Sequence, residues 1–341
     1  MKKIINWGII GLGRASLNLA KEFKNIDNSN LLAVSSLSKE KRDFFKKEFN
    51  LNDEYIFSDY EQIIKNNDID VIYIALPNSL HEKYCIESIK NNKNILIEKP
   101  LTFSTDSFDK IITEFKQKNI LIEEGTSNKF HPFYNEVFKS LNKINFNQIK
   151  YIESSFGNDA LGGKKLFNFR FKRINTKKPL FNRDLFGGSI LDGGIYPVSL
   201  LVDIFNFFNE NISDCKILNC KKNISKGIDI ESSLELLIQN KLIRFETSLI
   251  NKLDNNFKIF TDSEEMIFEN IFTINSDTMV KFKSGKNINI IKNSYTKTSY
   301  HYEIKEISNL IISKDNNKKI IDKNVFKIKN NNNLISKWFE Y

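Results

Sequence analysis

The first sixteen residues strongly limit how this chain can fold. Ile4 to Ile10 has the composition of a buried strand, and it runs directly into a glycine-rich turn and an amphipathic helical pattern. Glycines at 11 and 13 permit a tight turn and let backbone N–H groups approach a pyrophosphate at a helix N-terminus. The order strand, turn, helix predicts a dinucleotide site with contacts at Gly11, Gly13, Arg14 and Ala15. The alternative is a tight turn that binds nothing, and Ser16 replaces the third glycine of the fingerprint.

Up to about residue 125, short apolar runs alternate with helical patterns, which is typical of a parallel sheet covered by helices on both faces. Candidate N-caps precede the helical patterns: Ser38 before 39–49, Ser79 before 80–91, and Ser104 or Thr105 before 106–118. We therefore predict an α/β domain over residues 1–125, a doubly wound parallel Rossmann sheet. Its predicted strands are 3–10, 31–37, 70–76, 94–98 and 120–124.

The pattern changes after a helical stretch around 132–143. Apolar runs now follow one another without helices between them, which favours an open, mostly antiparallel sheet. Residues 126–341 are thus predicted to form an α+β domain for substrate binding and oligomerisation. Helices are expected at 199–208 and near 302–312, and loops at the Asn-rich stretches 314–319 and 329–333. The predicted strands are 149–156, 230–238, 242–250, 257–262, 265–269 and 288–293.

Composition excludes several classes of function. The formal net charge is +9, but the basic residues are spread along the chain and are not interleaved with aromatics, which argues against nucleic-acid binding. No run approaches the roughly 20 apolar residues of a membrane helix, and the N-terminus lacks a signal-peptide pattern. The three cysteines and three histidines lack ligand spacing. We expect a soluble, cytoplasmic protein with no metal site, structural disulfide, nucleic-acid partner or membrane partner.

The end of the second strand bears on the choice of cofactor. An Asp or Glu there would bind the 2′-hydroxyl of NAD and repel the 2′-phosphate of NADP, but residues 29–39 contain no acid. Hydroxyls at Ser36 and Ser38, with Lys41 and Arg42 one turn later, suit a phosphate. The pattern favours NADP(H) over NAD(H). The alternative is that the two cations belong to a solvated helix face.

The strand at 70–76 ends in Leu76, Pro77 and Asn78, at the sheet edge where ligands bind in this kind of fold. Pro77 fixes the turn, and Asn78 or His81 is predicted to hydrogen-bond the ribose or carboxamide of the cofactor. The alternative for His81 is a solvent-facing residue in the first turn of the next helix.

Lys99 is the strongest candidate for a catalytic residue in the first domain. It follows a short apolar strand and Glu98, and Pro100 then ends the strand at the same sheet edge. The positive charge of such a lysine can steer a substrate hydroxyl and lower the pKa of a neighbouring phenol. The alternative is a surface cation, which is what most lysines are.

In the second domain, residues 187–197 form a conspicuous glycine-rich segment, GGSILDGGIYP. It places one acid, Asp192, four residues before one phenol, Tyr196, so the two share a face if the segment is helical. Pro197 disfavours helical geometry at Tyr196 and suggests a kink. Tyr196 near Lys99 would act as a general acid or base while Asp192 binds the substrate. The alternative is a glycine-rich helix start with a packed tyrosine.

Taken in order, these motifs resemble the Gfo/Idh/MocA family, the group of glucose-fructose oxidoreductase and inositol dehydrogenase. The resemblance covers essentially the whole chain, and its most specific part is Glu98-Lys99-Pro100 followed about ninety residues later by Asp-Gly-Gly-x-Tyr-Pro. The matching segments are GIIGLGRAS at 8–16, AVSSLS at 33–38, ALPNSLH at 75–81, EKPLT at 98–102, EGTSNKFHP at 124–132 and GGSILDGGIYPV at 187–198.

The resemblance implies an NAD(P)-dependent oxidoreductase with Lys99 as the catalytic lysine, Asp192 as the substrate-binding acid and Tyr196 as the proton-transfer group. The Tyr-Pro version is similar to the branch of dihydrodiol and xylose dehydrogenases, so the implied substrate is a sugar, polyol or diol. It also implies a homo-oligomer, dimer or tetramer, formed through the second sheet. Lys129 replaces a frequent arginine, and Leu37 stands where an arginine commonly meets the 2′-phosphate, which leaves the preference for NADP open.

Two other functions stay open. A non-catalytic dinucleotide-binding regulator of a sugar pathway would share the fold, because a fold does not fix an activity. An oxidoreductase of a nucleotide-linked sugar in glycan biosynthesis would need cations for a diphosphate. Candidates are Lys164, Lys165, Arg170, Lys172 and Arg173, although a solvated loop explains them equally well.

Overall fold

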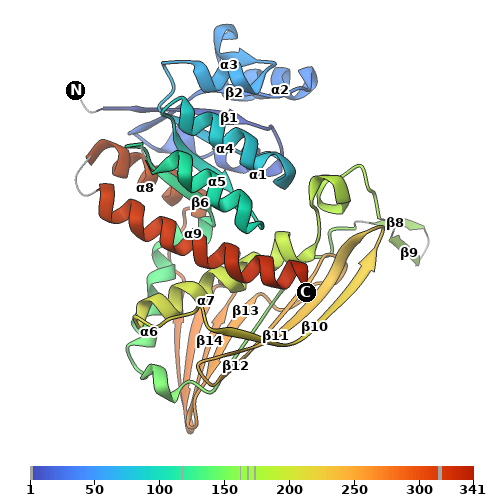
Figure 1. Cartoon of the computed structure of the whole chain (residues 1–341), viewed down its shortest axis with the longest axis vertical. Coiled ribbons are helices and arrows are strands. Elements are labelled where there is room, and N and C mark those ends of the chain that lie inside the picture. The colour runs from blue at the N-terminus through green and yellow to red at the C-terminus, as the bar shows by residue number, and fades with distance from the viewer. Residues whose placement is uncertain (1–2, 117, 162, 167–168, 173, 314–316) are drawn as a thin grey trace. The chain divides into compact units, whose positions relative to one another are not determined.

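The computed structural model describes residues 3–116, 118–161, 163–166, 169–172, 174–313 and 317–341 (Figure 1). The chain divides into two compact units. The first comprises Met1–Phe130 and Lys297–Asn332, and the second comprises His131–Thr296 and Asn333–Tyr341. The predicted boundary at residue 125 therefore lies close to the first crossing, but a C-terminal segment that we expected in the second domain packs with the first.

The first unit is built on a six-stranded parallel sheet with the order β3-β2-β1-β4-β5-β6. All five predicted strands are present, and β3 is a two-residue strand that the sequence pattern did not reveal. Central strands such as β1 and β4 are buried on both faces, which explains their continuous apolar composition. The strands are β1 Ile5–Ile10, β2 Ser29–Ser35, β3 Ile56–Phe57, β4 Val71–Ile74, β5 Asn94–Glu98 and β6 Ile122–Gly125.

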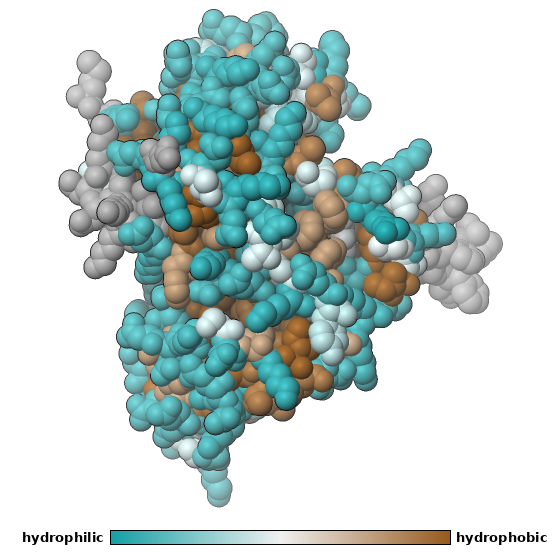
Figure 2. All heavy atoms as spheres, viewed as in Figure 1, coloured by the Kyte–Doolittle hydropathy of each residue, from teal (hydrophilic) through white to brown (hydrophobic). Residues whose placement is uncertain are grey.

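Helices cover both faces of this sheet. Ser38 and Ser104 accept hydrogen bonds from the backbone of Lys41 and Ser107, so both predicted N-caps are confirmed. Ser79 is not a cap, because it lies inside a short 3-10 helix, Asn78–Leu80, that precedes α4. Hydrophilic side chains dominate the surface over α2 and α3 on the face seen in Figure 2. The helices are α1 Arg14–Ala20, α2 Lys39–Phe49, α3 Tyr60–Lys65, α4 His81–Lys90 and α5 Thr105–Phe115.

Helix α8, Ser299–Ser313, explains why the chain returns to the first unit. Ile304 and Ile307 are fully buried in the same apolar cluster as Trp7 of β1. The indole of Trp7 donates to the Ser308 hydroxyl at 3.0 Å. The next helix, α9, spans Asn317–Glu340 and includes residues 329–333, so the loop predicted there was wrong. Of the other predicted loop, 314–319, residues 314–316 lie outside the described residues and 317–319 belong to α9. Asn330, Asn331 and Asn332 are buried, and the Asn331 amide donates to Glu124, so packing outweighs the low helix propensity of asparagine.

The second unit contains an eight-stranded sheet with the order β10-β11-β12-β7-β13-β14-β15-β16. All neighbours are antiparallel except β12 and β7, so the predicted open, mostly antiparallel sheet is confirmed. Strands β10 and β15 were missed, because their alternation of lysine with apolar residues resembles a polar loop. The strands are β7 Tyr151–Gly157, β10 Cys215–Ser225, β11 Ile228–Ile238, β12 Lys241–Ser248, β13 Asn256–Phe260, β14 Glu264–Glu269, β15 Met279–Ser284 and β16 Asn287–Lys292.

The remaining elements of this unit are helical or form a small hairpin. Helix α6 spans Asn135–Leu141 and α7 spans Ile195–Phe207, while β8, Gly163–Leu166, pairs with β9, Phe169–Lys172. The side chains of the cations predicted to meet a diphosphate, residues 164–173, lie outside the described residues. By length and composition, the stretch Arg183–Phe207 could cross a membrane, but 72% of its most apolar window is buried inside the structure, as in a core helix.

Candidate functional site

The glycine turn after β1 has the geometry of a dinucleotide cradle. Gly11 adopts φ +87°, and a Cβ atom there would lie 2.4 Å from the Ala75 carbonyl oxygen, so the position requires glycine. Gly13 precedes α1, and a Cβ atom there would meet nothing within 4 Å. At Gly11 the turn thus lies close to the backbone of Ala75, and at Gly13 it leaves open space at the start of a helix. This open helix start fits a pyrophosphate. Arg14 and Ala15 form the first residues of α1.

Ser16, which departs from the glycine fingerprint, is built into the turn. Its side chain is fully buried, and its hydroxyl donates to the Gly11 carbonyl oxygen. A serine in place of the third glycine therefore adds a hydrogen bond that holds the turn. The departure does not remove the cradle.

The loop after β2 carries the two predicted hydroxyls. The Ser36 hydroxyl accepts from the Ser38 backbone N–H at 3.2 Å, and the Ser38 hydroxyl accepts from the Lys41 N–H at 3.3 Å. Each hydroxyl keeps its own hydrogen for an acceptor such as a phosphate oxygen. The Arg42 guanidinium donates to the Ser36 carbonyl at 2.5 Å and thereby holds the loop. Leu37 is 75% exposed and offers no charge.

His81 has a different role from the one predicted. Its side chain is only 1% exposed, so the solvent-facing alternative is wrong. Nδ1 lies 2.9 Å from the Pro100 carbonyl oxygen and Nε2 lies 2.9 Å from the Leu76 carbonyl oxygen. Both ring nitrogens are therefore occupied by the chain itself and not by a ribose or carboxamide. Burial lowers the pKa of His81, although the two carbonyls act in the opposite direction.

This contact joins the ends of two neighbouring strands. Leu76 and Pro77 follow β4, and Asn78 begins the short 3-10 helix while remaining partly exposed. Because β1, β4 and β5 are adjacent and parallel, the residues after each strand lie along one edge of the sheet. The structure therefore brings the glycine turn, Leu76–Asn78 and Lys99 to the same edge, as the sequence predicted.

Lys99 follows the last residue of β5 and is partly exposed. The peptide bond between Lys99 and Pro100 is cis. On one side of Lys99, the Tyr73 hydroxyl donates to the Glu98 carboxylate. On the other side, the His81 ring contacts Pro100. The backbone that carries Lys99 is thus anchored before and after the lysine, which is how a catalytic side chain is held in place.

Buried carboxylates that sequence reasoning missed lie in the same unit. Glu124 of β6 accepts from the Leu101 backbone N–H and from the Asn331 amide, both at 2.8 Å, and burial raises its pKa. Glu303 of α8 is 1% exposed, and burial, followed by the charge of Glu98, raises its pKa well above the usual value. Glu124 lies inside an apolar run, the predicted strand 120–124, and this position could have indicated a buried carboxylate. Glu303 had no such signal.

In the second unit, the glycine-rich segment forms a π-helix, Ile190–Gly194, that continues into α7. Asp192 lies in the π-helix and Tyr196 in the first turn of α7, and both are partly exposed. The irregularity expected near Pro197 is present, but it precedes Tyr196, whose own backbone is helical. Single π-helical turns are frequent at functional sites. The Tyr196 ring packs against Phe156 and Phe272, with centroids 5.2 and 6.0 Å apart.

A buried carboxylate that the sequence did not reveal fixes the start of this segment. One oxygen of Asp229 accepts from the Ser189 hydroxyl and from the Ile190 backbone N–H, both at 2.7 Å. Gly188 adopts φ +134°, and a Cβ atom there would lie 2.2 Å from the other Asp229 oxygen. Burial raises the pKa of Asp229, while the two hydrogen bonds oppose that shift. Asp229 stands between Ile228 and Ile230 in the sequence, which gave no sign of this contact.

Each half of the candidate site is thus ordered within its own unit. Lys99 belongs to the first unit, and Asp192 and Tyr196 belong to the second, so their joint action stays a prediction. In the described part of the chain, no group of three His, Cys, Asp or Glu residues is arranged to hold a metal ion. The three cysteines are free thiols.

Known proteins are similar to this chain in sequence or in fold. Residues 5–126 match the model of an oxidoreductase family with an NAD-binding Rossmann fold. The trans-1,2-dihydrobenzene-1,2-diol dehydrogenase of Xenopus laevis is 27% identical over 202 residues, which are 59% of this chain and 56% of that protein. The NADP(+)-dependent scyllo-inositol 2-dehydrogenase IolU of Bacillus subtilis is 27% identical over 205 residues, 59% of this chain and 58% of that protein. The chain spans somewhat more than half the length of these relatives.

A solved structure extends the likeness to the second unit. The 3-ketoreductase KijD10 from Actinomadura kijaniata, in complex with NADP and TDP-benzene, has a TM-score of 0.82 at 16% sequence identity. The match covers 98% of this chain and 96% of that chain. At this identity the likeness concerns the fold, and it confirms the predicted combination of a Rossmann sheet with an open, mostly antiparallel sheet.

Proposed function

We propose that this chain is a member of the Gfo/Idh/MocA family of oxidoreductases and that it transfers a hydride between NAD(P) and a secondary hydroxyl or lactol of a sugar, polyol or diol. The observation that carries the proposal is the position of Lys99. This lysine lies at the same sheet edge as the glycine turn, on a backbone anchored by Glu98 and Pro100. We infer that the amine of Lys99 acts in a reaction beside a bound dinucleotide and does not serve to pack the fold.

The bound cofactor supplies the hydride acceptor or donor. The chain's own residues then handle the substrate and its proton. Lys99 and Asp192 bind and orient the reacting hydroxyl, and Tyr196 removes or returns the hydroxyl proton at its phenolic oxygen. Phe156 and Phe272 pack on the Tyr196 ring and limit its motion. Fixed geometry supplies most of the rate, about 7–11 kcal/mol in favourable cases, and the proton-transfer group adds roughly 10²- to 10⁴-fold.

NADP(H) is the cofactor that we favour. The hydroxyls of Ser36 and Ser38 keep a hydrogen for a phosphate, and residues 29–39 hold no carboxylate that would repel it. Lys41 lies one turn later at the solvent-exposed start of α2. NAD(H) remains the competitor because Leu37 contributes no cation.

We also propose a cytoplasmic homo-oligomer, dimer or tetramer, that forms through the sheet of the second unit. Ile288 and Ile290 of edge strand β16 are 59% and 47% exposed on the same side of the strand. Exposed apolar rows on an edge strand favour pairing with another copy. Changing both residues to lysine should reduce the mass found by analytical ultracentrifugation. An unchanged mass would place the contact elsewhere.

The test of the main proposal is a panel of aldoses, inositols and trans-diols with NAD⁺ and NADP⁺, followed at 340 nm. We expect turnover with at least one substrate, and a loss of at least 100-fold in kcat in Tyr196→Phe and in Lys99→Ala, with cofactor binding retained. Tyr341→Phe, at an exposed phenol, and Lys216→Ala, at an exposed lysine, are the matched controls. Cofactor binding without any turnover would instead indicate the non-catalytic regulator.

A further inference from the structure

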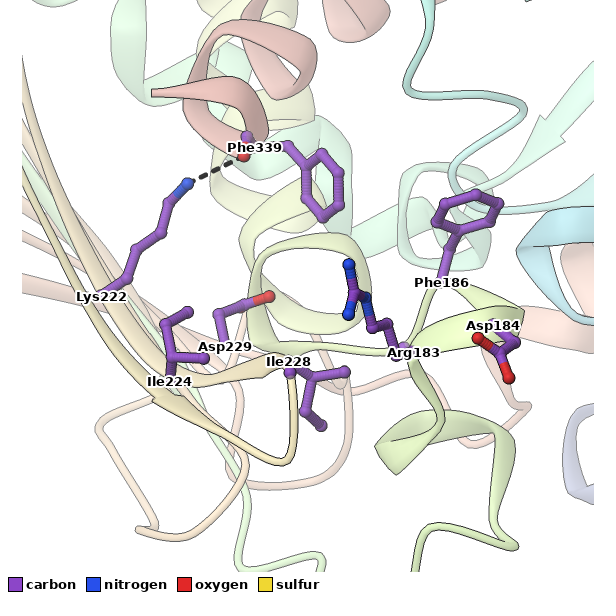
Figure 3. A pocket seen from close by; sticks show the side chains of 10 residues that line it. Arg183, Asp184, Phe186, Lys222, Ile224, Ile228, Asp229 and Phe339 are labelled. Atoms are coloured by element: carbon purple, nitrogen blue, oxygen red, sulfur yellow. Dashed lines mark hydrogen bonds between the residues drawn. The ribbon is translucent and has the colours of Figure 1, made fainter.

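The second unit contains a pocket of about 430 Å³ whose lining does not include Asp192 or Tyr196. It lies between the loop at Arg183–Gly187, the hairpin of β10 and β11, and the end of α9 at Phe339 (Figure 3). Its volume falls within the roughly 300–1,000 Å³ of sites for small molecules. The pocket therefore has the size of a ligand site of its own.

One wall presents a phenyl ring at an unfavourable backbone conformation. Phe186 adopts φ 53° and ψ 51°, the left-handed region that bulky residues rarely enter, and its side chain is 39% exposed. Ile224 on the hairpin is 56% exposed and lines the same pocket. Residues that are held in sparsely populated backbone regions cluster at active sites and ligand sites. Phe186 and Ile224 thus give the pocket an apolar surface, about the size of one ring, that is open to solvent.

The polar lining contains both signs of charge. Arg183 and Lys222 provide donors, and Asp184 and Asp229 provide acceptors. Lys222 is fixed by donating to the Phe339 carbonyl at 2.8 Å, and Arg183 is the second cation of the lining. A Cβ atom at Gly227 would lie 3.0 Å from Arg183 Cδ, so glycine at the hairpin turn leaves room for the arginine.

This combination selects one class of ligand. Two carboxylates disfavour a diphosphate, and two cations disfavour an amine. A neutral molecule with several hydroxyls can donate to carboxylates and accept from cations at once, while its apolar face rests on a phenyl ring. A pyranose ring has these properties.

The pocket shares a wall with the segment that carries the proposed substrate residues. Asp229 lines the pocket and also accepts from Ile190 N–H, two residues before Asp192. We propose that this pocket binds a second sugar unit, so that the substrate is a glycoside or disaccharide and not a free monosaccharide. The proposal rests on the proposed function and adds a subsite to it.

The test is the binding of maltose, cellobiose and lactose to the full chain by titration calorimetry. We expect at least one disaccharide to bind, and Arg183→Ala and Phe186→Gly each to weaken that binding at least tenfold. Phe186→Gly should melt no lower than the parent, because glycine tolerates the left-handed conformation. Lys216→Ala and Leu218→Ala, exposed positions on β10 outside the pocket, are the matched controls and should bind normally.

Three results would overturn the subsite: no disaccharide binds, both pocket variants bind like the parent, or inorganic pyrophosphate displaces the sugar. The turnover assay keeps this inference separate from the proposed function. If disaccharide binding depends on Arg183 and Phe186 but no sugar is oxidised or reduced, the subsite stands and the enzyme activity fails. If sugars are turned over and the variants bind and react normally, the activity stands and the subsite fails.

Discussion

The edge of the first sheet and the start of the π-helix in the second unit hold their functional side chains in different ways. At the sheet edge, Lys99 follows a strand, and neighbouring strand ends support it through Glu98 and His81. In the second unit, one carboxylate, Asp229, holds the first turn of the helical segment through two hydrogen bonds. Support from several strands tolerates change better than support from a single side chain. We therefore expect the second unit's half of the site to be the more fragile.

Removing Asp229 should have the largest effect. Asp229→Ala leaves the Ser189 hydroxyl and the Ile190 N–H without their acceptor, so we expect a loss of about 2–3 kcal/mol in the free energy of unfolding and a marked fall in kcat. Asp229→Asn keeps an oxygen at this place and should recover most of both. Urea denaturation and turnover measure the two effects. If Asp229→Ala unfolds at the same urea concentration as the parent, Asp229 is not what holds the start of the helical segment.

His81 provides the corresponding test in the first unit, with a smaller expected effect. The neutral imidazole carries a single N–H, so His81→Ala leaves one of the two carbonyl groups without its donor, and we expect a loss of about 1–2 kcal/mol in the free energy of unfolding. Urea denaturation measures it beside Asp229→Ala. A loss larger than that of Asp229→Ala would reverse the comparison.

The pH dependence of His81 gives a second observable. Its folded pKa is lowered, so below the ordinary value near 6.5 the unfolded chain binds a proton that the folded chain does not. Stability should therefore be complete above pH 6.5 and decline as the pH falls, by at most about 1.4 kcal/mol per pH unit from this group. His81→Gln should reduce that slope. His301, whose pKa burial also lowers, would retain part of it.

Glu303→Gln should stabilise the first unit and sharpen the contrast with Asp229. The folded pKa of Glu303 is raised, so its contribution to stability is complete below the ordinary value of 4.5 and is lost as the pH rises through the folded pKa. The amide carries no such penalty, so the variant's advantage should grow with pH, by up to about 1.4 kcal/mol per pH unit in that window. Thermal melts from pH 4 to 8 measure it. An advantage that is constant with pH would contradict the assignment.

Ser36→Asp tests the choice of cofactor more than stability, although a carboxylate at this position, which is only 5% exposed, carries some cost in the free energy of unfolding. An aspartate can accept the same bond from the Ser38 N–H that the serine accepts. Its charge should disfavour a 2′-phosphate, and we expect the ratio of kcat/KM for NADP⁺ to that for NAD⁺ to fall at least tenfold. A ratio that does not change would show that this loop does not contact the adenosine end. Ser58→Asp, in another loop of the unit, is the control.

The sequence predicted what local chemistry determines. The turn at Gly11 and Gly13 and the caps Ser38 and Ser104 depend on residues within a few positions of one another, and all are present. Asp229 and Glu303 act on partners far along the chain, and no short pattern reveals such contacts. His81 combines both cases, because its place in a motif was visible while its bonds to Leu76 and Pro100 required the fold.

The return of Lys297–Asn332 to the first unit bears on how this protein can be divided for experiments. A clone that stops at residue 130 would encode all six strands of the nucleotide-binding sheet but would leave Trp7 without Ile304, Ile307 and Ser308 beside it. Such a fragment would expose an aromatic surface and precipitate. A single-chain fusion of 1–130 to 297–332 through a flexible tether would restore that cover and provide a nucleotide-binding module for separate study.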